Sequence, residues 1–148
     1  EIAQSLARYE KNLFVEFAEF KEYDLEEFME DVVDFTAGGI KIAIDDYGKA
    51  YSSQSLIANF SPSVIKIDME LIKGIDTNKR KQMMVKSIAN YCDNLDIKCV
   101  AEGISCREEM LMCASLGVHF LQGFYLGKPQ EFPRDIDDDI KKEILQAV

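Results

Sequence analysis

Two adjacent acids, Asp45 and Asp46, follow an apolar run and are the residues in this sequence that most directly suggest chemistry. Residues 40–44 are rich in isoleucine and follow Gly38 and Gly39, which predicts a short buried strand. Parallel α/β folds bind their ligands at the carboxyl ends of strands, where these two carboxylates would lie. Asp is also common in turns, so this segment alone leaves a polar-turn interpretation open.

The other predicted strands also end in polar residues. Glu16 closes the first strand, Glu102 the fourth and Gln122 the fifth, while Lys66 lies inside the third and Asp68 follows it. The carboxyl ends of the strands of a (β/α) barrel converge on one mouth. We therefore expect one cavity to be lined by Glu16, Asp45, Asp46, Lys66, Glu102 and Gln122. A lysine inside an apolar strand is unfavourable without a partner, which favours a shared site over separate solvated acids.

Several carboxylates in one cavity repel one another strongly unless cations neutralise them. Sites with only oxygen ligands suit Mg²⁺ or Mn²⁺. Two such ions about 3.5–4 Å apart form an arrangement for phosphodiester hydrolysis, because they activate a water and stabilise the leaving oxygen. In such a site Lys66 would contact the attacking water or a phosphate oxygen.

Strand and helix patterns alternate along the chain, which predicts an α/β fold with a parallel sheet. The predicted strands are residues 13–17, 40–44, 64–68, 97–101 and 119–122. The predicted helices are residues 2–10, a helix capped by Asp24 and ended by Gly38 and Gly39, a short one from Ser52 or Ser53, one capped by Thr77, one with Ser105 and Glu108 as a capping box, and an acidic one over 135–147.

The 148 residues amount to one domain, and 47% hydrophobic content is typical of a globular protein. The net charge of -10 argues against broad electrostatic binding of nucleic acid. No apolar run approaches the ~20 residues of a membrane helix, and no leader is evident. We therefore expect a soluble, cytoplasmic chain without a membrane segment.

Four cysteines, Cys92, Cys99, Cys106 and Cys113, are spaced seven residues apart. This spacing lacks the close pairs of a zinc site, and no histidine stands nearby in a ligand pattern. We expect reduced, mostly buried thiols. His119, the only histidine, lies in an apolar run and is expected to have a packed or hydrogen-bonded structural role.

Five segments resemble, in the same order, those of EAL domains, the bacterial cyclic di-GMP phosphodiesterases. Residues 45–53, D-D-Y-G-K-A-Y-S-S, are similar to the family's loop D-D-F-G-x-G-Y-S-S. Residues 15–19 (V-E-F-A-E) resemble E-L-T-E, and residues 65–68 (I-K-I-D) resemble K-I-D. Residues 100–103 (V-A-E-G) resemble V-A-E-G, and residues 121–129 (L-Q-G-F-Y-L-G-K-P) resemble Q-G-Y-x-x-x-K-P. The match covers nearly the whole chain.

The resemblance implies a TIM-barrel-like fold and hydrolysis of cyclic di-GMP to linear pGpG with two Mg²⁺ or Mn²⁺ ions. It makes metal ligands of Glu16, Asp45 and Asp46. Glu102 would hold the second metal or act as general base, Lys66 would position the attacking water, and Gln122 would complete the site. The loop from Asp45 to Ser53, which includes Ser52, would couple substrate, metals and formation of a homodimer, with Glu19 anchoring it.

The family's Glu-Ala-Leu segment and the Asn-bearing strand after it do not occur in residues 1–148. The family's barrel has eight strands, and the pattern here predicts five. We expect residues 1–148 to be the C-terminal portion of a single EAL-type domain whose remainder lies upstream and could include a membrane anchor. Two chains that complete one another, or an open half-barrel, are the alternatives. We expect no useful turnover by residues 1–148 alone, because the metals would be under-coordinated.

Two departures lie within the matched segments. Lys49 and Ala50 stand where the family usually has Thr-Gly, and Ser105 stands where it usually has a second Glu. Both changes point toward weakened catalysis, and the second removes a loop anchor or outer carboxylate. The alternative to a phosphodiesterase is therefore a degenerate EAL domain that binds cyclic di-GMP or a protein partner without hydrolysis. An unrelated α/β module with chance acids is a third interpretation.

Overall fold

The computed structural model describes residues 13–18, 25–49, 57, 60–132 and 134–148. These residues form one five-stranded parallel sheet in the order β1-β2-β3-β4-β5. The strands are β1 (Phe14–Ala18), β2 (Lys41–Tyr47), β3 (Val64–Ile67), β4 (Lys98–Ala101) and β5 (Phe120–Leu121). The helices are α2 (Leu25–Ala37), α4 (Met69–Ile72), α5 (Lys79–Asn94), α6 (Arg107–Ser115) and α7 (Asp138–Ala147). The predicted α/β class and parallel sheet are confirmed.

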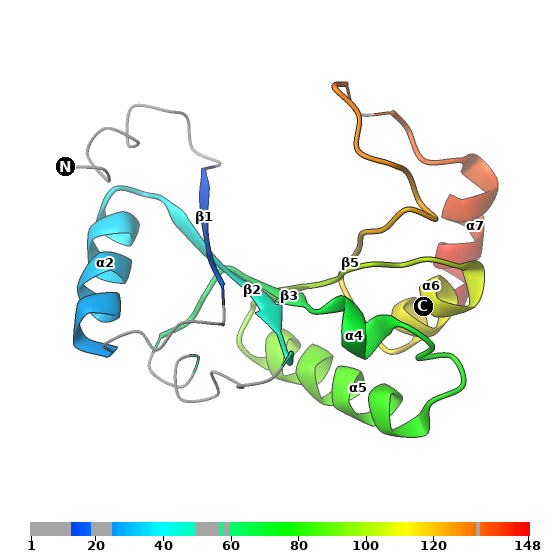
Figure 1. The fold of residues 1–148 in the computed structure, drawn as a ribbon, viewed down its shortest axis with the longest axis horizontal. Coiled ribbons are helices and arrows are strands. Elements are labelled where there is room, and N and C mark those ends of the chain that lie inside the picture. Colours follow the sequence, from blue (N-terminus) through cyan, green and yellow to red (C-terminus); the bar gives the residue numbers. More distant parts are fainter. Residues whose placement is uncertain (1–12, 19–24, 50–56, 58–59, 133) are drawn as a thin grey trace.

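The core lies between the middle of the sheet and the helices that follow its strands. Figure 1 shows α2, α5 and α6 succeeding one another around one side of the sheet. Ile65 and Ile67 of β3 are fully buried, as are Val85 and Ala89 of α5. Each buried isoleucine stabilises the fold by about 1.5–3 kcal/mol. The central strand is therefore firmly held, and it is the strand that carries Lys66.

The structure corrects several predicted helix boundaries. Asn78, not Thr77, caps α5, because its side chain accepts hydrogen bonds from two backbone N–H groups of the first turn. The terminal helix begins at Asp138 with Asp137 as its cap, three residues later than predicted. The short helix α4 was not predicted, since its four residues carry no periodic pattern.

The capping box assigned to Ser105 and Glu108 is wrong. Cys106 occupies the cap position of α6, and the carboxylate that reaches back to Ser105 belongs to Glu109. Ser105 and Glu108 have the spacing of a capping box, so the sequence pattern favoured Glu108 over its neighbour Glu109.

The strand boundaries shift by smaller amounts. The second strand continues through the two acids to Tyr47, and the fifth contains only two residues. Gly38 and Gly39 follow the end of α2 as predicted, and Gly39 has a φ of 77°. Three predicted features lie outside the described residues. They are the helix at residues 2–10, the start of the short helix at Ser52 or Ser53, and the cap at Asp24.

All four cysteines are free, and Cys92, Cys99 and Cys113 are buried, as predicted. The backbone N–H of Cys99 donates to Nδ1 of His119 at 3.1 Å, and Nε2 of His119 lies 2.9 Å from a carboxylate oxygen of Asp93. His119 thus joins β4 to α5, which confirms its structural role. Within the described ranges, no helix has the length and apolar character needed to cross a membrane.

Candidate metal centre

Backbone hydrogen bonds hold the carboxyl ends of the three middle strands at one level. Past the end of β3, the N–H of Asp68 donates to the carbonyl oxygen of Tyr47 at 3.1 Å. Past the end of β4, the N–H of Glu102 donates to the carbonyl oxygen of Ile67 at 3.1 Å. The polar residues that close these strands are thereby placed side by side.

Asp45 and Asp46 form an irregularity in the pairing of β2 with β3. The register shifts between Ile44 and Tyr47, so that the two acids lie opposite the single residue Lys66. Asp46 also has a φ of 55°, in the left-handed region. Neighbouring side chains of a regular strand point to opposite faces, whereas a bulge redirects one of them. The bulge is what allows two consecutive carboxylates to serve one site.

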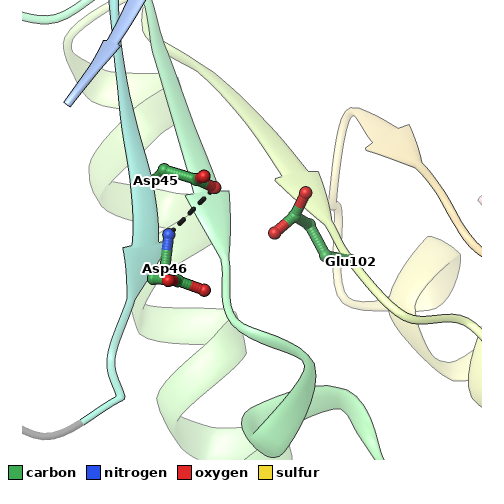
Figure 2. A group of neighbouring side chains, drawn as sticks. All are labelled: Asp45, Asp46 and Glu102. Atoms are coloured by element: carbon green, nitrogen blue, oxygen red, sulfur yellow. Dashed lines mark hydrogen bonds between the residues drawn. The ribbon is translucent and has the colours of Figure 1, made fainter. Parts of the chain in front are cut away.

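Three carboxylates meet at this edge of the sheet. Asp45, Asp46 and Glu102 each offer an oxygen, and these oxygens all lie within 4.8 Å of one another (Figure 2). The N–H of Asp46 donates to Oδ1 of Asp45 at 3.0 Å, which orients that carboxylate. A set of carboxylate oxygens this close fits a hard divalent cation such as Mg²⁺ or Mn²⁺.

Lys66 lies at the centre of the acids, with its side chain 14% exposed. Its Nζ is 2.9 Å from Oδ1 of Asp45, 3.0 Å from Oε1 of Glu102 and 3.3 Å from Oε2 of Glu16. Burial lowers the pKa of Lys66, but hydrogen bonds to Asp45 and Glu102 outweigh burial and raise it above its ordinary value. The expectation that a lysine in this strand needs a partner is met by three carboxylates, and Lys66 remains a cation.

Burial and crowding raise the pKa values of two of the acids, Asp46 and Glu102. Burial raises the pKa of Glu102, and the nearby charges of Asp45 and Asp46 raise it further, against the opposing effect of Lys66. Burial also raises the pKa of Asp46, together with a side-chain hydrogen bond to Asp68. A bound divalent cation would relieve this unfavourable concentration of negative charge.

Lys49 approaches the same cluster from the loop after β2. Its Nζ lies 3.7 Å from Oδ2 of Asp46 and 3.8 Å from Oδ2 of Asp68. Asp68 is only 2% exposed and caps α4 by accepting a hydrogen bond from the N–H of Glu70 at 2.7 Å. Neither Lys49 nor Asp68 was predicted to line the site, although the matched I-K-I-D segment contains Asp68.

Two glycines allow the loop after Glu102 to pack closely. Gly103 has a φ of 73°, and a Cβ there would lie 2.5 Å from Cβ of Met69. A Cβ on Gly123 would lie 2.2 Å from the carbonyl oxygen of Ile104. Side chains at these two positions would push the Glu102 loop away from its neighbours.

Gln122 contributes to this packing through its backbone. Its N–H donates to the carbonyl oxygen of Ala101 at 2.9 Å, and its own carbonyl oxygen accepts from the N–H of Ile104 at 3.0 Å. The side-chain role assigned to Gln122 therefore stays a prediction. Glu19, Ser52 and Ser53 lie outside the described residues, so their assignments also stay predictions.

A family model described as "EAL domain" matches residues 1–129 of the chain. The blue light- and temperature-regulated antirepressor BluF of Escherichia coli is 31% identical over 119 residues, 80% of this chain and 30% of BluF. The probable cyclic di-GMP phosphodiesterase PdeA of Escherichia coli is 35% identical over 92 residues, 62% of this chain and 13% of PdeA. The chain thus spans less than a third of the length of either relative.

Solved structures agree with this match. BlrP1 of Klebsiella pneumoniae, in a manganese and cyclic di-GMP complex, superposes with a TM-score of 0.75 at 35% identity, covering 78% of this chain and 30% of BlrP1. A standalone EAL protein of Vibrio cholerae in its c-di-GMP bound form gives a TM-score of 0.81 at 28% identity, covering 94% and 60%.

Proposed function

The chain belongs to the EAL domain family, and from that premise we propose that the protein containing it hydrolyses cyclic di-GMP to linear pGpG at a site for two divalent cations. The observation that carries this proposal is the cluster of Asp45, Asp46 and Glu102, of which Asp45 and Glu102 pair with the ammonium of Lys66. Relatives named as cyclic di-GMP phosphodiesterases and neighbours solved with cyclic di-GMP and manganese support the choice of substrate and metal. We propose Mn²⁺ or Mg²⁺ as the working ion.

Each charged residue has a proposed task. Asp45, Asp46, Glu102 and Glu16 would hold the cations. When bound, the cations would lower the pKa of a water and stabilise the leaving oxygen. Glu102 would either hold the second cation or act as general base for the attacking water. Lys66 keeps Asp45 and Glu102 oriented and can donate a hydrogen bond to the attacking water or to a phosphate oxygen.

The phosphates of the substrate would extend toward β5. A pocket of about 390 Å³ lies at the carboxyl end of that strand. Its lining includes Gln122, Gly123, Lys128 and Arg134. The lining also contains Asp135, so the two cations exceed the acids by one, and the pocket suits a phosphodiester or a guanine with its exposed acceptors. We propose that Gln122, within the segment similar to Q-G-Y-x-x-x-K-P, contacts substrate there.

We propose that residues 1–148 form the C-terminal portion of one EAL domain that works in the bacterial cytoplasm. We also propose a homodimer through the region of the Asp45–Ser53 loop, with Ser52 and Ser53 linking substrate to the dimer contact and Glu19 anchoring the loop.

The direct test is a hydrolysis assay with the full-length protein. Cyclic di-GMP and Mn²⁺ should give pGpG, separated by liquid chromatography, and a chelator should stop its release. The variant Asp45→Asn should lose this activity while keeping the wild-type circular dichroism spectrum. Unchanged activity in Asp45→Asn would contradict the site assignment.

A cyclic di-GMP receptor without hydrolysis is the second candidate, and the position of Lys49 favours it. Its ammonium lies 3.7 Å from Oδ2 of Asp46, where it would compete with a bound cation. Wild-type protein that binds cyclic di-GMP, but releases no pGpG over a range of Mn²⁺ concentrations, would establish the receptor and exclude the enzyme.

A further inference from the structure

Glu109 is a buried carboxylate, 3% exposed, in the first turn of α6. One of its oxygens accepts from the N–H of Gly74 at 2.8 Å. The other accepts from the N–H of Ser105 at 2.9 Å and from the hydroxyl of Ser105 at 2.8 Å. A carboxylate removed from water in this way is held by charge-assisted hydrogen bonds and has a fixed orientation.

These bonds join the segments that follow two neighbouring strands. Gly74 lies just beyond α4, the helix capped by Asp68 directly after the strand that carries Lys66. Ser105 lies three residues after Glu102, in the loop between β4 and α6. The carboxylate of Glu109 therefore joins the segment that follows the Lys66 strand to the loop that follows Glu102.

Ser105 stands where the family usually has a second Glu in V-A-E-G-V-E, and the sequence predicted the loss of a carboxylate at this point. The structure has a carboxylate there, supplied by Glu109. We propose that Glu109 is a positioning residue of the metal centre, which takes over the anchoring task of the Glu that Ser105 replaces and keeps Glu102 in register with Asp45 and Asp46. This inference rests on the proposed function of the site.

A helix cap would explain only part of the arrangement. Glu109 does reach back to the residues before α6, as the third residue of a capping box does. The bond to Gly74, however, belongs to a different segment and contributes nothing to capping α6. A capping residue would affect stability alone, whereas a positioning residue would also affect the affinity of the site for its cation.

The test measures Mn²⁺ binding to the full-length protein without substrate, by the electron paramagnetic resonance signal of free Mn²⁺. Glu109→Gln should weaken Mn²⁺ binding about tenfold, the range expected when a residue that orients a metal ligand is changed. The double variant Ser105→Glu/Glu109→Gln should return to within about threefold of wild type, because the carboxylate is restored from position 105. Glu108→Gln, a change of the neighbouring exposed acid, is the matched control and should bind as wild type does.

Glu109→Gln that stays folded and binds Mn²⁺ as the control does would overturn the proposal, even if its unfolding temperature falls. If Glu109→Gln does not fold, the double variant decides, since failure to recover Mn²⁺ binding overturns the proposal equally. Because this readout needs no substrate, a wild type that binds Mn²⁺ but releases no pGpG would contradict the proposed hydrolysis and leave the positioning result standing.

Discussion

Asp45 and Asp46 are consecutive in the sequence, yet both carboxylates reach the same cluster with Glu102. The β-bulge opposite Lys66 and the left-handed backbone of Asp46 bring this about. The Asp46 N–H also donates to the carboxylate of Asp45, so the first acid is oriented by the backbone of the second. The positions of both carboxylates therefore depend on how β2 pairs with β3.

Lys66→Met should abolish hydrolysis and lower the stability of the metal-free protein. Removing the ammonium leaves the Asp45 and Glu102 carboxylates close together without their cation. We expect a loss of about 1–3 kcal/mol in the free energy of unfolding, measured by urea denaturation. Saturating Mn²⁺ should recover part of it, since the ion replaces the missing positive charge. Lys41→Met, at an exposed position of β2, is the control, and equal losses in the two variants would contradict the central place of Lys66.

Glu102→Gln should bind cyclic di-GMP as wild type does but turn it over at least about 100-fold more slowly. The amide keeps the shape of the side chain, but it cannot accept a proton from water. Calorimetric binding and the rate of pGpG release separate the two effects. Parallel losses of affinity and rate would assign Glu102 to substrate binding instead of to base catalysis.

Lys49→Thr should strengthen Mn²⁺ binding by roughly two- to fivefold. The ammonium of Lys49 lies near Asp46 and Asp68 but is partly exposed, so its electrostatic effect on the site is screened. Hydrolysis below Mn²⁺ saturation should rise by a similar factor. Lys98→Thr, an exposed lysine at the start of β4, should leave Mn²⁺ binding unchanged. A decrease in affinity for Lys49→Thr would show that Lys49 supports the site.

The contribution of Glu109 to stability should depend on pH. Burial raises the pKa of Glu109, but hydrogen bonds from Gly74, Ser105 and Cys106 outweigh it and hold the pKa below the ordinary value of 4.5. The folded protein therefore binds this proton less readily than the unfolded chain. The stabilisation is present above pH 4.5 and is lost as the pH falls through the lowered pKa.

Urea denaturation of wild type and Glu109→Gln should show a difference in unfolding free energy near neutral pH that narrows as the pH falls below 4.5. The raised pKa values of Asp46 and Glu102 act with the opposite sign, but they are shared by both proteins and cancel in the difference. A difference that stays constant with pH would show that the carboxylate of Glu109 does not act through its charge.

The location of the site could be predicted from sequence because it follows from local patterns. Short apolar runs identified the strands, and Asp45 and Glu102 stand near the carboxyl ends of two of them, which meet in any parallel sheet. Glu16 was predicted to close the first strand, but β1 continues to Ala18 and Glu16 is its middle residue. Lys66 was informative because a lysine in an apolar strand needs partners, and the structure supplies three.

The finer arrangement depends on contacts between distant segments. The bulge at Asp46 follows from the register between β2 and β3, which no local pattern specifies. Glu109 was not predicted to anchor this loop, because Ser105 and Glu108 have the spacing of a capping box. Only the packing of α6 against the turn at Gly74 selects Glu109. The loss of an anchoring carboxylate at Ser105 stays a prediction, and the proposed role of Glu109 is the alternative to it.

The most direct test of the metal centre is anomalous X-ray diffraction from crystals of the full-length protein soaked in Mn²⁺ with cyclic di-GMP. Data collected on the two sides of the manganese absorption edge locate Mn²⁺ without reference to activity. We predict manganese peaks within coordination distance of the carboxylates of Asp45, Asp46 and Glu102, and none there in Asp45→Asn. A wild-type cluster without a manganese peak would contradict the assignment of these acids as metal ligands.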